Sequence, residues 1–232
     1  MGRETTFAVV DIGSTKIATL IASRNGQDEL SVLGCGTVKV EDIFRKGILS
    51  NIDRTARTLA MSVSAAEEMA GIKVQNLTVG FSGEHLRSFN SLGVVPVSKT
   101  ENQITENEVE AVIEAAQAVR LPFEREILHV LPQEFFIDQG DGIKDPIGNT
   151  GVRLEVQVHV VTASTAATQA IYKAVRMAGY EITNLVLNPI VVGSALLSAE
   201  EEEVGTLLID IGGSATDIAT VSYTHLTLPT KR

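Results

Sequence analysis

Hydrophobic residues recur along this chain with two different periods, and the alternation of these periods predicts its fold class. An apolar run over 7–12 leads into a turn of glycine and hydroxyl residues, which predicts a strand followed by a turn. Apolar residues spaced three and four apart over 53–70 predict an amphipathic helix, with Asn51 or Asp53 as its N-cap. Because strand and helix periods follow one another, we expect an α/β protein.

The same two periods predict most of the remaining elements. Further strands are expected over 16–22, 30–40, 74–81, 182–187, 204–210 and 216–220, and further helices over 164–177 and 189–199. Asn25-Gly26, between the first two of these strands, is a strong hairpin signal. These elements predict a layered α/β domain.

The segment 84–163 interrupts this pattern and has one of its own. An extended stretch over 84–97 precedes the capping box Thr105-Glu-Asn-Glu108, which opens a helix. A second strand region, over 127–137, is interrupted by Pro132. The third strand, over 152–162, places alternate apolar residues on one face: Val152, Leu154, Val156, Val158 and Val160. The order strand, helix, strand, strand predicts a small inserted α+β unit.

Composition narrows the classes of function. The chain is 44% hydrophobic and 21% charged, which is typical of a soluble globular protein. Its 29 acidic residues outnumber the 19 basic ones, and a net charge of −10 argues against broad nucleic-acid binding. No apolar run approaches the ~20 residues of a membrane span. The single cysteine, Cys35, excludes an internal disulfide and suits a reducing cytoplasm.

The last twelve residues, 221–232, do not continue the pattern. They follow a predicted strand without a further element to pair with it, and they resemble one reading frame of a transposase-end sequencing adapter. We therefore expect a non-native segment, the alternative being an ordinary frayed C-terminus. Lys231 and Arg232 are the only charged residues of this segment, since His225 is counted as neutral. Without the segment, the net charge of the chain is therefore −12.

Two acidic glycine turns carry the candidate chemistry. The segments 11–16 (Asp-Ile-Gly-Ser-Thr-Lys) and 210–217 (Asp-Ile-Gly-Gly-Ser-Ala-Thr-Asp) each follow an apolar strand and precede another. Glycines let the backbone approach a phosphate, while hydroxyls and Lys16 add donors. An aspartate beside such a turn can hold Mg²⁺ through water. The pair predicts a clamp on a triphosphate; the alternative is a repeated α/β half without a ligand.

These paired turns resemble the two phosphate motifs of the actin, Hsp70 and sugar-kinase ATPase superfamily. Within it, the chain resembles the FtsA family of bacterial cell-division proteins from about Phe7 to Thr220. The most family-specific stretches are 128–134 (Leu-His-Val-Leu-Pro-Gln-Glu), 142–146 and 151–155, all in the inserted unit. The dipeptide Asn188-Pro189 and the helix after it resemble the first connecting helix of the family.

The resemblance implies a site for ATP and Mg²⁺. The residues that it assigns to the phosphate turns are Asp11, Gly13, Ser14, Thr15, Lys16, Asp210, Gly212, Gly213, Ser214, Thr216 and Asp217. Asp11 and Asp210 would organise Mg²⁺ through water. Ser214 stands where the family often has a third glycine, and a left-handed backbone there would cost about 1 kcal/mol. No acidic residue lies near the start of the helix at Pro189, which favours a slow or switch-like ATPase.

The resemblance also implies the domain organisation. An actin-like, ribonuclease H-like α/β lobe (subdomain 1A) would comprise 1–83 and 164–188, with a small α+β subdomain (1C, SHS2-like) inserted at 84–163. Residues 189–220 would begin a second lobe, subdomain 2A, that is cut short. An adenosine motif would then lie outside the chain, so we expect weak or absent ATP binding and an inactive fragment. We also expect the strand 216–220 to be an unpaired, aggregation-prone edge.

The function implied by the resemblance is that of an ATP-binding, actin-like cell-division protein. Such a protein polymerises, anchors FtsZ filaments to the cytoplasmic face of the membrane at the division septum, and recruits later division proteins through 84–163. Its contacts with FtsZ and with the membrane would lie beyond this chain. The alternatives are a small-molecule kinase, an Hsp70-like chaperone ATPase or a PilM-like pilus-assembly ATPase of the same superfamily. A kinase would need a substrate pocket and a catalytic acid, and the sequence indicates neither.

Three histidines in the inserted region, His85, His129 and His159, are candidate metal ligands by residue type alone. Their wide spacing fits no known ligand pattern, so we expect packing or surface roles. Cys35 lies between Gly34 and Gly36, which indicates a small strand residue rather than a catalytic thiol.

Overall fold

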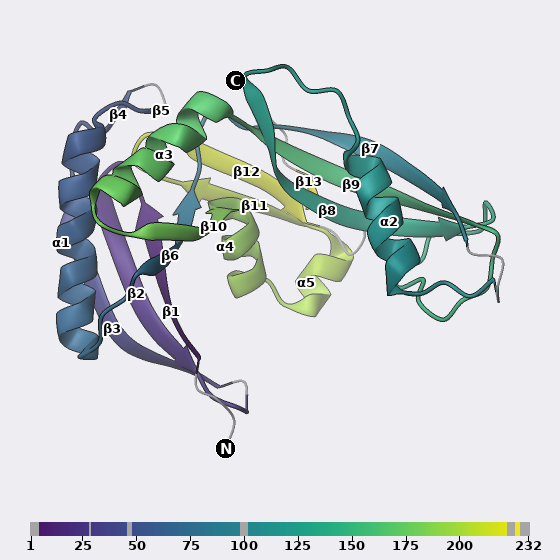
Figure 1. The fold of residues 1–232 in the computed structure, drawn as a ribbon, viewed down its shortest axis with the longest axis horizontal. Helices are drawn as coiled ribbons and strands as arrows, with labels where there is room; N and C mark the ends of the chain where they lie inside the picture. The colour runs from purple at the N-terminus through teal and green to yellow at the C-terminus, as the bar shows by residue number, and fades with distance from the viewer. Residues whose placement is uncertain (1–4, 28, 46–47, 98–101, 222–225, 228–232) are drawn as a thin grey trace. The chain divides into compact units, whose positions relative to one another are not determined.

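The computed structural model describes residues 5–27, 29–45, 48–97, 102–221 and 226–227 (Figure 1). The chain divides into two compact units. Unit 1 comprises Met1–His85, Ser164–Ala195 and Ile209–Asp217, and unit 2 comprises Leu86–Ala163, Leu196–Leu208 and Ile218–Arg232. The α/β fold class predicted from the sequence is confirmed.

Unit 1 contains a five-stranded sheet in the order β10-β6-β1-β2-β3. The strands are β1 (Thr5–Ile12), β2 (Lys16–Arg24), β3 (Leu30–Lys39), β6 (Asn76–Phe81) and β10 (Glu181–Leu187), and two short strands, β4 (Phe44–Arg45) and β5 (Ile48–Leu49), pair separately. The β1–β2 and β2–β3 pairs are antiparallel, whereas β1–β6 and β6–β10 are parallel. The hairpin predicted at Asn25 is confirmed. The side-chain oxygen of Asn25 accepts from the Gln27 and Glu29 N–H groups.

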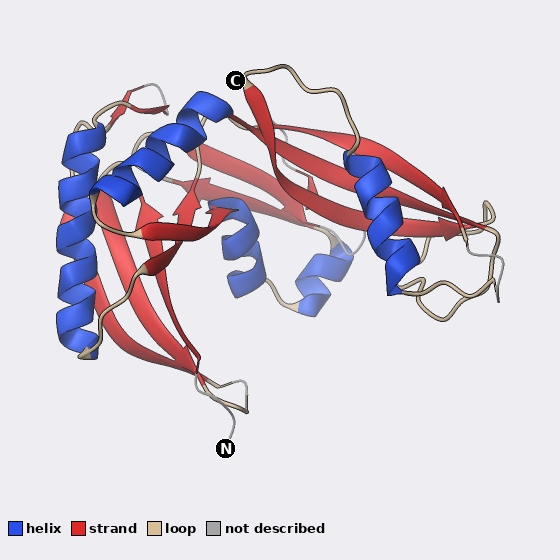
Figure 2. Ribbon diagram, in the orientation of Figure 1, coloured by secondary structure: helices blue, strands red, loops and turns tan. Residues whose placement is uncertain are grey.

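Two helices, α1 (Ile52–Ala70) and α3 (Thr165–Met177), pack against each other in unit 1 (Figure 2). The N-cap of α1 is Asn51, whose side chain accepts from the Arg54 N–H, rather than Asp53. Helix α1 lies directly on β3. The packing is so close that a Cβ atom on Gly36 would be 2.1 Å from the Ser62 carbonyl oxygen. The glycines of the Gly34-Cys35-Gly36 sequence thus allow this helix to approach the strand closely.

The segment after β10 differs from the prediction of a single helix over 189–199. It forms α4 (Asn188–Leu196) and a separate α5 (Ala199–Val204). The cause is a capping box: Ser198 accepts from the Glu201 N–H, and the Glu201 carboxylate accepts from the Ser198 N–H. This local signal starts a new helix where apolar spacing alone predicted continuation.

The chain continues into a three-stranded sheet in the order β11-β12-β13. Its strands are β11 (Thr206–Ile211), β12 (Thr216–Val221) and β13 (Leu226–Thr227). The expectation that 216–220 would be an unpaired edge is therefore wrong: β12 lies between two strands, and Thr220 pairs with Thr227. That partner strand belongs to the segment 221–232; residues 222–225 and 228–232 lie outside the described residues.

Unit 2 contains the inserted strand, helix, strand, strand order that the sequence predicts. The elements are β7 (Arg87–Pro96), α2 (Glu106–Gln117), β8 (Arg125–Ile137) and β9 (Arg153–Ser164), and the sheet order is β7-β9-β8. The capping box at Thr105 is present. Helix α2 lies on β7 at Gly93, where a Cβ atom would be 2.1 Å from the Val112 carbonyl oxygen. Leu154, Val156, Val158 and Val160 of β9 form the core beneath it.

Two details of the inserted unit were predicted wrongly. Strand β8 continues through Pro132, because β8 lies at the edge of its sheet and an edge position does not require every N–H group. Val152 is 63% exposed and precedes β9, so it does not share the buried face of that strand. Its N–H instead donates to the Asp138 carboxylate in the preceding loop.

No helix in the described part of the chain has the length and apolar character needed to span a bilayer.

Candidate phosphate-binding site

The first acidic turn lies at the carboxyl ends of the parallel strands of unit 1. Asp11 is the penultimate residue of β1 and pairs in register with Gly80 of β6. Asn188 follows directly after β10, the next parallel strand. The carboxyl ends of parallel strands are where open α/β sheets bind ligands. The sheet therefore places the predicted turn at a position suited to a ligand.

The two acidic turns have matching backbone geometry. The Gly13 N–H donates to the Lys16 carbonyl oxygen at 3.0 Å, and the Gly212 N–H donates to the Ala215 carbonyl oxygen at 2.9 Å. In both turns an aspartate lies two residues before the donating glycine. The equivalence that the sequence suggested thus extends to the hydrogen bonds that close each turn.

The tips of the two turns contact each other within unit 1. A Cβ atom on Gly213 would be 2.5 Å from Thr15 Cγ2 and 2.9 Å from Ser14 Oγ, so a side chain at position 213 would require these two side chains to shift. The structure therefore brings together residues about 200 positions apart in the sequence. It joins the hydroxyl side chains of the first turn to the glycine backbone of the second.

The carboxylate of Asp11 is half-buried and has a partner that the site prediction did not include. The Asn188 Nδ2 group donates to Asp11 Oδ1 at 3.0 Å. The sequence signal for this contact was weak: an asparagine before the proline that opens a helix is usually explained by that helix start alone.

The second turn has a partially buried carboxylate at Asp217. Burial raises the pKa of Asp217 above its usual value, the charge of Asp210 raises it further, and a hydrogen bond with the Ser82 side chain opposes the rise. Ser82 follows β6, so the end of this strand serves both turns: Gly80 lies opposite Asp11, and Ser82 contacts Asp217. Ser82 was also absent from the predicted site.

Besides Gly213, five of the predicted residues are exposed to solvent. Thr15, Lys16, Gly212, Ser214 and Thr216 are exposed. Ser214 needs no left-handed backbone, because the described non-glycine residues with positive φ are Asp42, Asn102, Asp138 and Gln139. The cost anticipated for serine at this position does not arise.

The residue types of the two turns fit a magnesium-bound phosphate chain. Mg²⁺ prefers oxygen ligands, typically one or two carboxylates with phosphate oxygens and water, and Asp11 and Asp210 supply two carboxylates. The turn glycines leave backbone close to the surface, and the hydroxyls and the Lys16 ammonium are donors suited to phosphate. The donor set is therefore consistent with the predicted clamp.

His85 and His159 each have a defined partner. His85 stacks on Phe81 with ring centroids 5.5 Å apart, and His159 Nδ1 lies 2.7 Å from Asn90 Oδ1. Burial lowers the pKa of both His129 and His159. In the part of the chain that the structure describes, no group of three or more histidine, cysteine, aspartate or glutamate residues is arranged to hold a metal ion.

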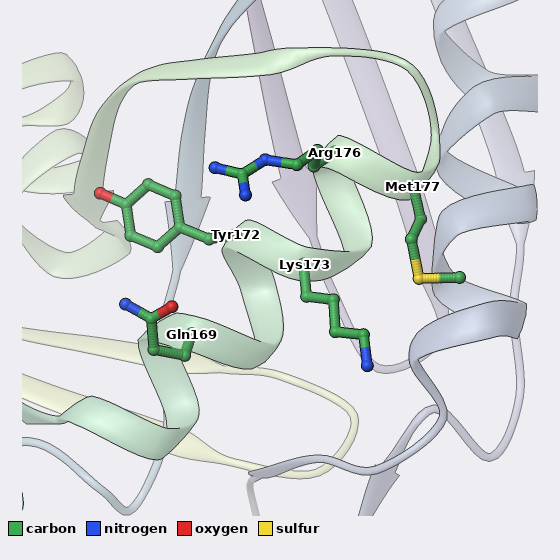
Figure 3. Close-up of a pocket in the computed structure, with 5 residues that line it drawn as sticks. All are labelled: Gln169, Tyr172, Lys173, Arg176 and Met177. Carbon is green, nitrogen blue, oxygen red and sulfur yellow. The ribbon is translucent and has the colours of Figure 1, made fainter.

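A surface hollow on α3 involves none of the predicted residues. Its lining consists of Gln169, Tyr172, Lys173, Arg176 and Met177 (Figure 3). Figure 3 shows Tyr172 and Arg176 extending to one side of the helix and Lys173 and Met177 to the other. This spacing is that of the solvent-facing side of an amphipathic helix.

Comparison with known proteins agrees with these features. The family model described as the SHS2 domain inserted in FtsA matches residues 83–162. The chain is 41% identical over 90% of its length to the cell division protein FtsA of Borreliella burgdorferi, and 37% identical over 90% of its length to that of Pseudomonas aeruginosa. It covers 50% of each, so the chain spans about half the length of these curated relatives.

A solved structure shares the fold. The PilM–PilN type IV pilus biogenesis complex contains a chain that aligns with 95% of this chain and is itself covered to 59%, with a TM-score of 0.65 and 18% identity. Identity this low shows the fold alone. Together with the SHS2 match, it identifies the fold as the actin-like ATPase fold with an inserted subdomain.

Proposed function

We propose, on the premise that this chain belongs to the FtsA family of cell-division proteins, that its two acidic turns bind the phosphates of ATP together with Mg²⁺. The relatives that support this premise are cell-division proteins matched across nine-tenths of the chain. The proposal that the ligand is ATP rests on the geometry of the site and on the predicted motifs.

The contact between the two turns is the observation that carries the proposal. A Cβ atom on Gly213 would meet the side-chain ends of Thr15 and Ser14, although the two turns are distant in the sequence. Matching turns that pack tip to tip would present donors from both to one phosphate chain. A β-turn with a purely structural role would not require its equivalent elsewhere in the chain to meet it.

Each group in the proposed site has a specific task. The turn N–H groups other than those of Gly13 and Gly212, the hydroxyls of Ser14 and Thr15, and Lys16 would bind phosphate oxygens. Asp11 and Asp210 would hold Mg²⁺ through water, and the ion would neutralise charge on the phosphates. The first turn of α4 contains no acidic residue, so the described residues offer no strong general base there. These groups suit binding and slow hydrolysis better than rapid group transfer.

The wider role follows from the family. An FtsA-type protein would use its ATP state to bias the contacts of an actin-like polymer, because a ligand shifts a conformational equilibrium by binding its states unequally. It would anchor FtsZ filaments at the cytoplasmic face of the septal membrane and recruit later division proteins through 84–163. Contacts with FtsZ and with membrane would reside in the part of such proteins beyond this chain.

The proposed domain boundaries are those inferred from the sequence: subdomain 1A over 1–83 and 164–188, subdomain 1C over 84–163, and the beginning of subdomain 2A over 189–220. The SHS2 match over 83–162 supports the second of these.

Phosphate binding is tested by calorimetry, in which inorganic tripolyphosphate is titrated into the chain itself in the presence of Mg²⁺. We expect weak binding that decreases about tenfold in Lys16→Ala, because Lys16 supplies a charge-assisted hydrogen bond. Lys144→Ala, in an exposed loop of unit 2, is the matched control. ATP should bind no more tightly than tripolyphosphate, because the predicted motifs recognise phosphate only. No binding at millimolar tripolyphosphate would refute the proposed site.

The division role is tested on a protein that extends this chain to the full length of its relatives. A pulldown with an FtsZ tail peptide should recover the protein. Failure to bind the peptide, combined with ATP turnover that depends on a sugar, would instead establish a small-molecule kinase.

A further inference from the structure

Asp11 has two carboxylate oxygens in different surroundings. Oδ1 accepts the hydrogen bond from Asn188 Nδ2 at 3.0 Å. Oδ2 lies on the side of the first turn, 3.7 Å from the position that a Cβ atom on Gly13 would take. One oxygen is therefore bound to the protein, while the other faces the turn.

Asn188 also explains a glycine in the sheet. A Cβ atom on Gly80 would be 2.6 Å from Asn188 Oδ1, and its next neighbours, Asn188 Cγ and the Val10 carbonyl oxygen, would both be at 3.8 Å. Among the described residues, the Asn188 amide is thus the only close obstacle to a side chain at position 80. Gly80 has no positive φ that would require glycine for backbone reasons.

We infer that Asn188 is a positioning residue that orients the Asp11 carboxylate for Mg²⁺ and its water, and that Gly80 provides the space for the Asn188 amide. By occupying Oδ1, the amide directs Oδ2 toward the turn where the phosphates would lie. Partners that orient a metal-binding carboxylate are a general feature of metal sites. This inference rests on the proposed phosphate site and extends it to two residues outside the turns.

The test measures how much Mg²⁺ improves tripolyphosphate binding, as the ratio of the dissociation constant in EDTA to that in Mg²⁺. Asn188→Ala should reduce this ratio about tenfold while leaving the affinity in EDTA unchanged. Asn184→Ala, an exposed asparagine on β10, is the matched control and should leave the ratio unchanged. A merely structural role would lower both affinities together.

A double-mutant cycle tests the role of Gly80. Gly80→Ala should also reduce the Mg²⁺ ratio, because its methyl group displaces the Asn188 amide. In the Asn188→Ala background the methyl group has space, so adding Gly80→Ala should cause no further loss. Gly80→Ala keeps Asn188 in the chain, so it tests the same contact if Asn188→Ala fails to fold.

The outcomes separate the two proposals. If the unmodified chain does not bind tripolyphosphate, the proposed function falls, and this inference falls with it. If it binds with a Mg²⁺ ratio that Asn188→Ala leaves intact, or if the two substitutions have additive effects, the role of Asn188 is refuted while the phosphate site stands.

Discussion

The β1–β2 and β11–β12 hairpins have the same turn but different surroundings. Val10 and Ile12 of the first hairpin are 1% and 4% exposed. At the equivalent positions of the second hairpin, counted from the aspartates, Ile209 and Ile211 are 50% and 78% exposed. The turns nevertheless close with hydrogen bonds of nearly equal length, 3.0 and 2.9 Å.

This difference shows which forces form each part of a hairpin. The turn depends on local hydrogen bonds and on glycine, so it forms without a covered apolar face. Burial of the strand depends on what packs against it, and only the first hairpin lies in a large sheet of unit 1. The second hairpin therefore has an apolar face that the described residues leave mostly exposed.

The largest effect should come from truncating the equivalent isoleucines. Ile12→Ala should reduce the free energy of unfolding by about 2–5 kcal/mol, because it removes a buried side chain and leaves a cavity. Ile211→Ala should change it by no more than about 0.5 kcal/mol, because that side chain is already in water. Urea denaturation of both variants measures the difference. Equal destabilisation would mean that the second hairpin is covered as well as the first.

A smaller effect is expected where the two hairpins meet. Gly213→Ala should destabilise unit 1 by about 1 kcal/mol and weaken tripolyphosphate binding, because the new methyl group contacts Thr15 Cγ2. Adding Thr15→Ser, which removes that methyl group, should restore part of both losses. Ser214→Ala, one residue along the same turn at an exposed position, is the control for stability, and Lys144→Ala remains the control for binding. If Gly213→Ala is silent in thermal melts and calorimetry, the turns do not touch in solution.

The smallest effect concerns pH. Because burial and the charge of Asp210 raise the pKa of Asp217, the folded chain retains a proton that the unfolded chain releases. Stability should therefore fall as pH rises from the usual value of 3.8 through the raised pKa of Asp217. Asp217→Asn should flatten this decline in urea midpoints collected from about pH 4 to pH 7.

The control for the pH experiment is Asp141→Asn, which makes the same change of charge in an exposed loop. It should keep the decline seen in the unmodified chain. A profile that Asp217→Asn leaves as steep as before would place the responsible group elsewhere.

Sequence reasoning predicted elements well where one local pattern acted alone. The period of apolar residues located α1, and the capping box at Thr105 located α2. It failed where a second local signal competed, as at Ser198, whose capping box divides the predicted helix into α4 and α5. It also failed at Pro132, because the effect of a proline depends on whether its strand lies at an edge, which the chain alone does not show.

In the candidate site, too, local features were predictable from the sequence and long-range contacts were not. The sequence by itself determined the two turns, since aspartate, glycine and hydroxyl residues after an apolar strand form a short-range pattern with short-range physics. Only the tertiary structure decided which groups surround them: Asn188 beside Asp11, Ser82 beside Asp217, and Gly213 against Thr15. These contacts join residues up to 198 positions apart, and no local periodicity encodes them. The contact of Asn188 with Asp11 depends on the order of parallel strands, which places the ends of β1, β6 and β10 side by side.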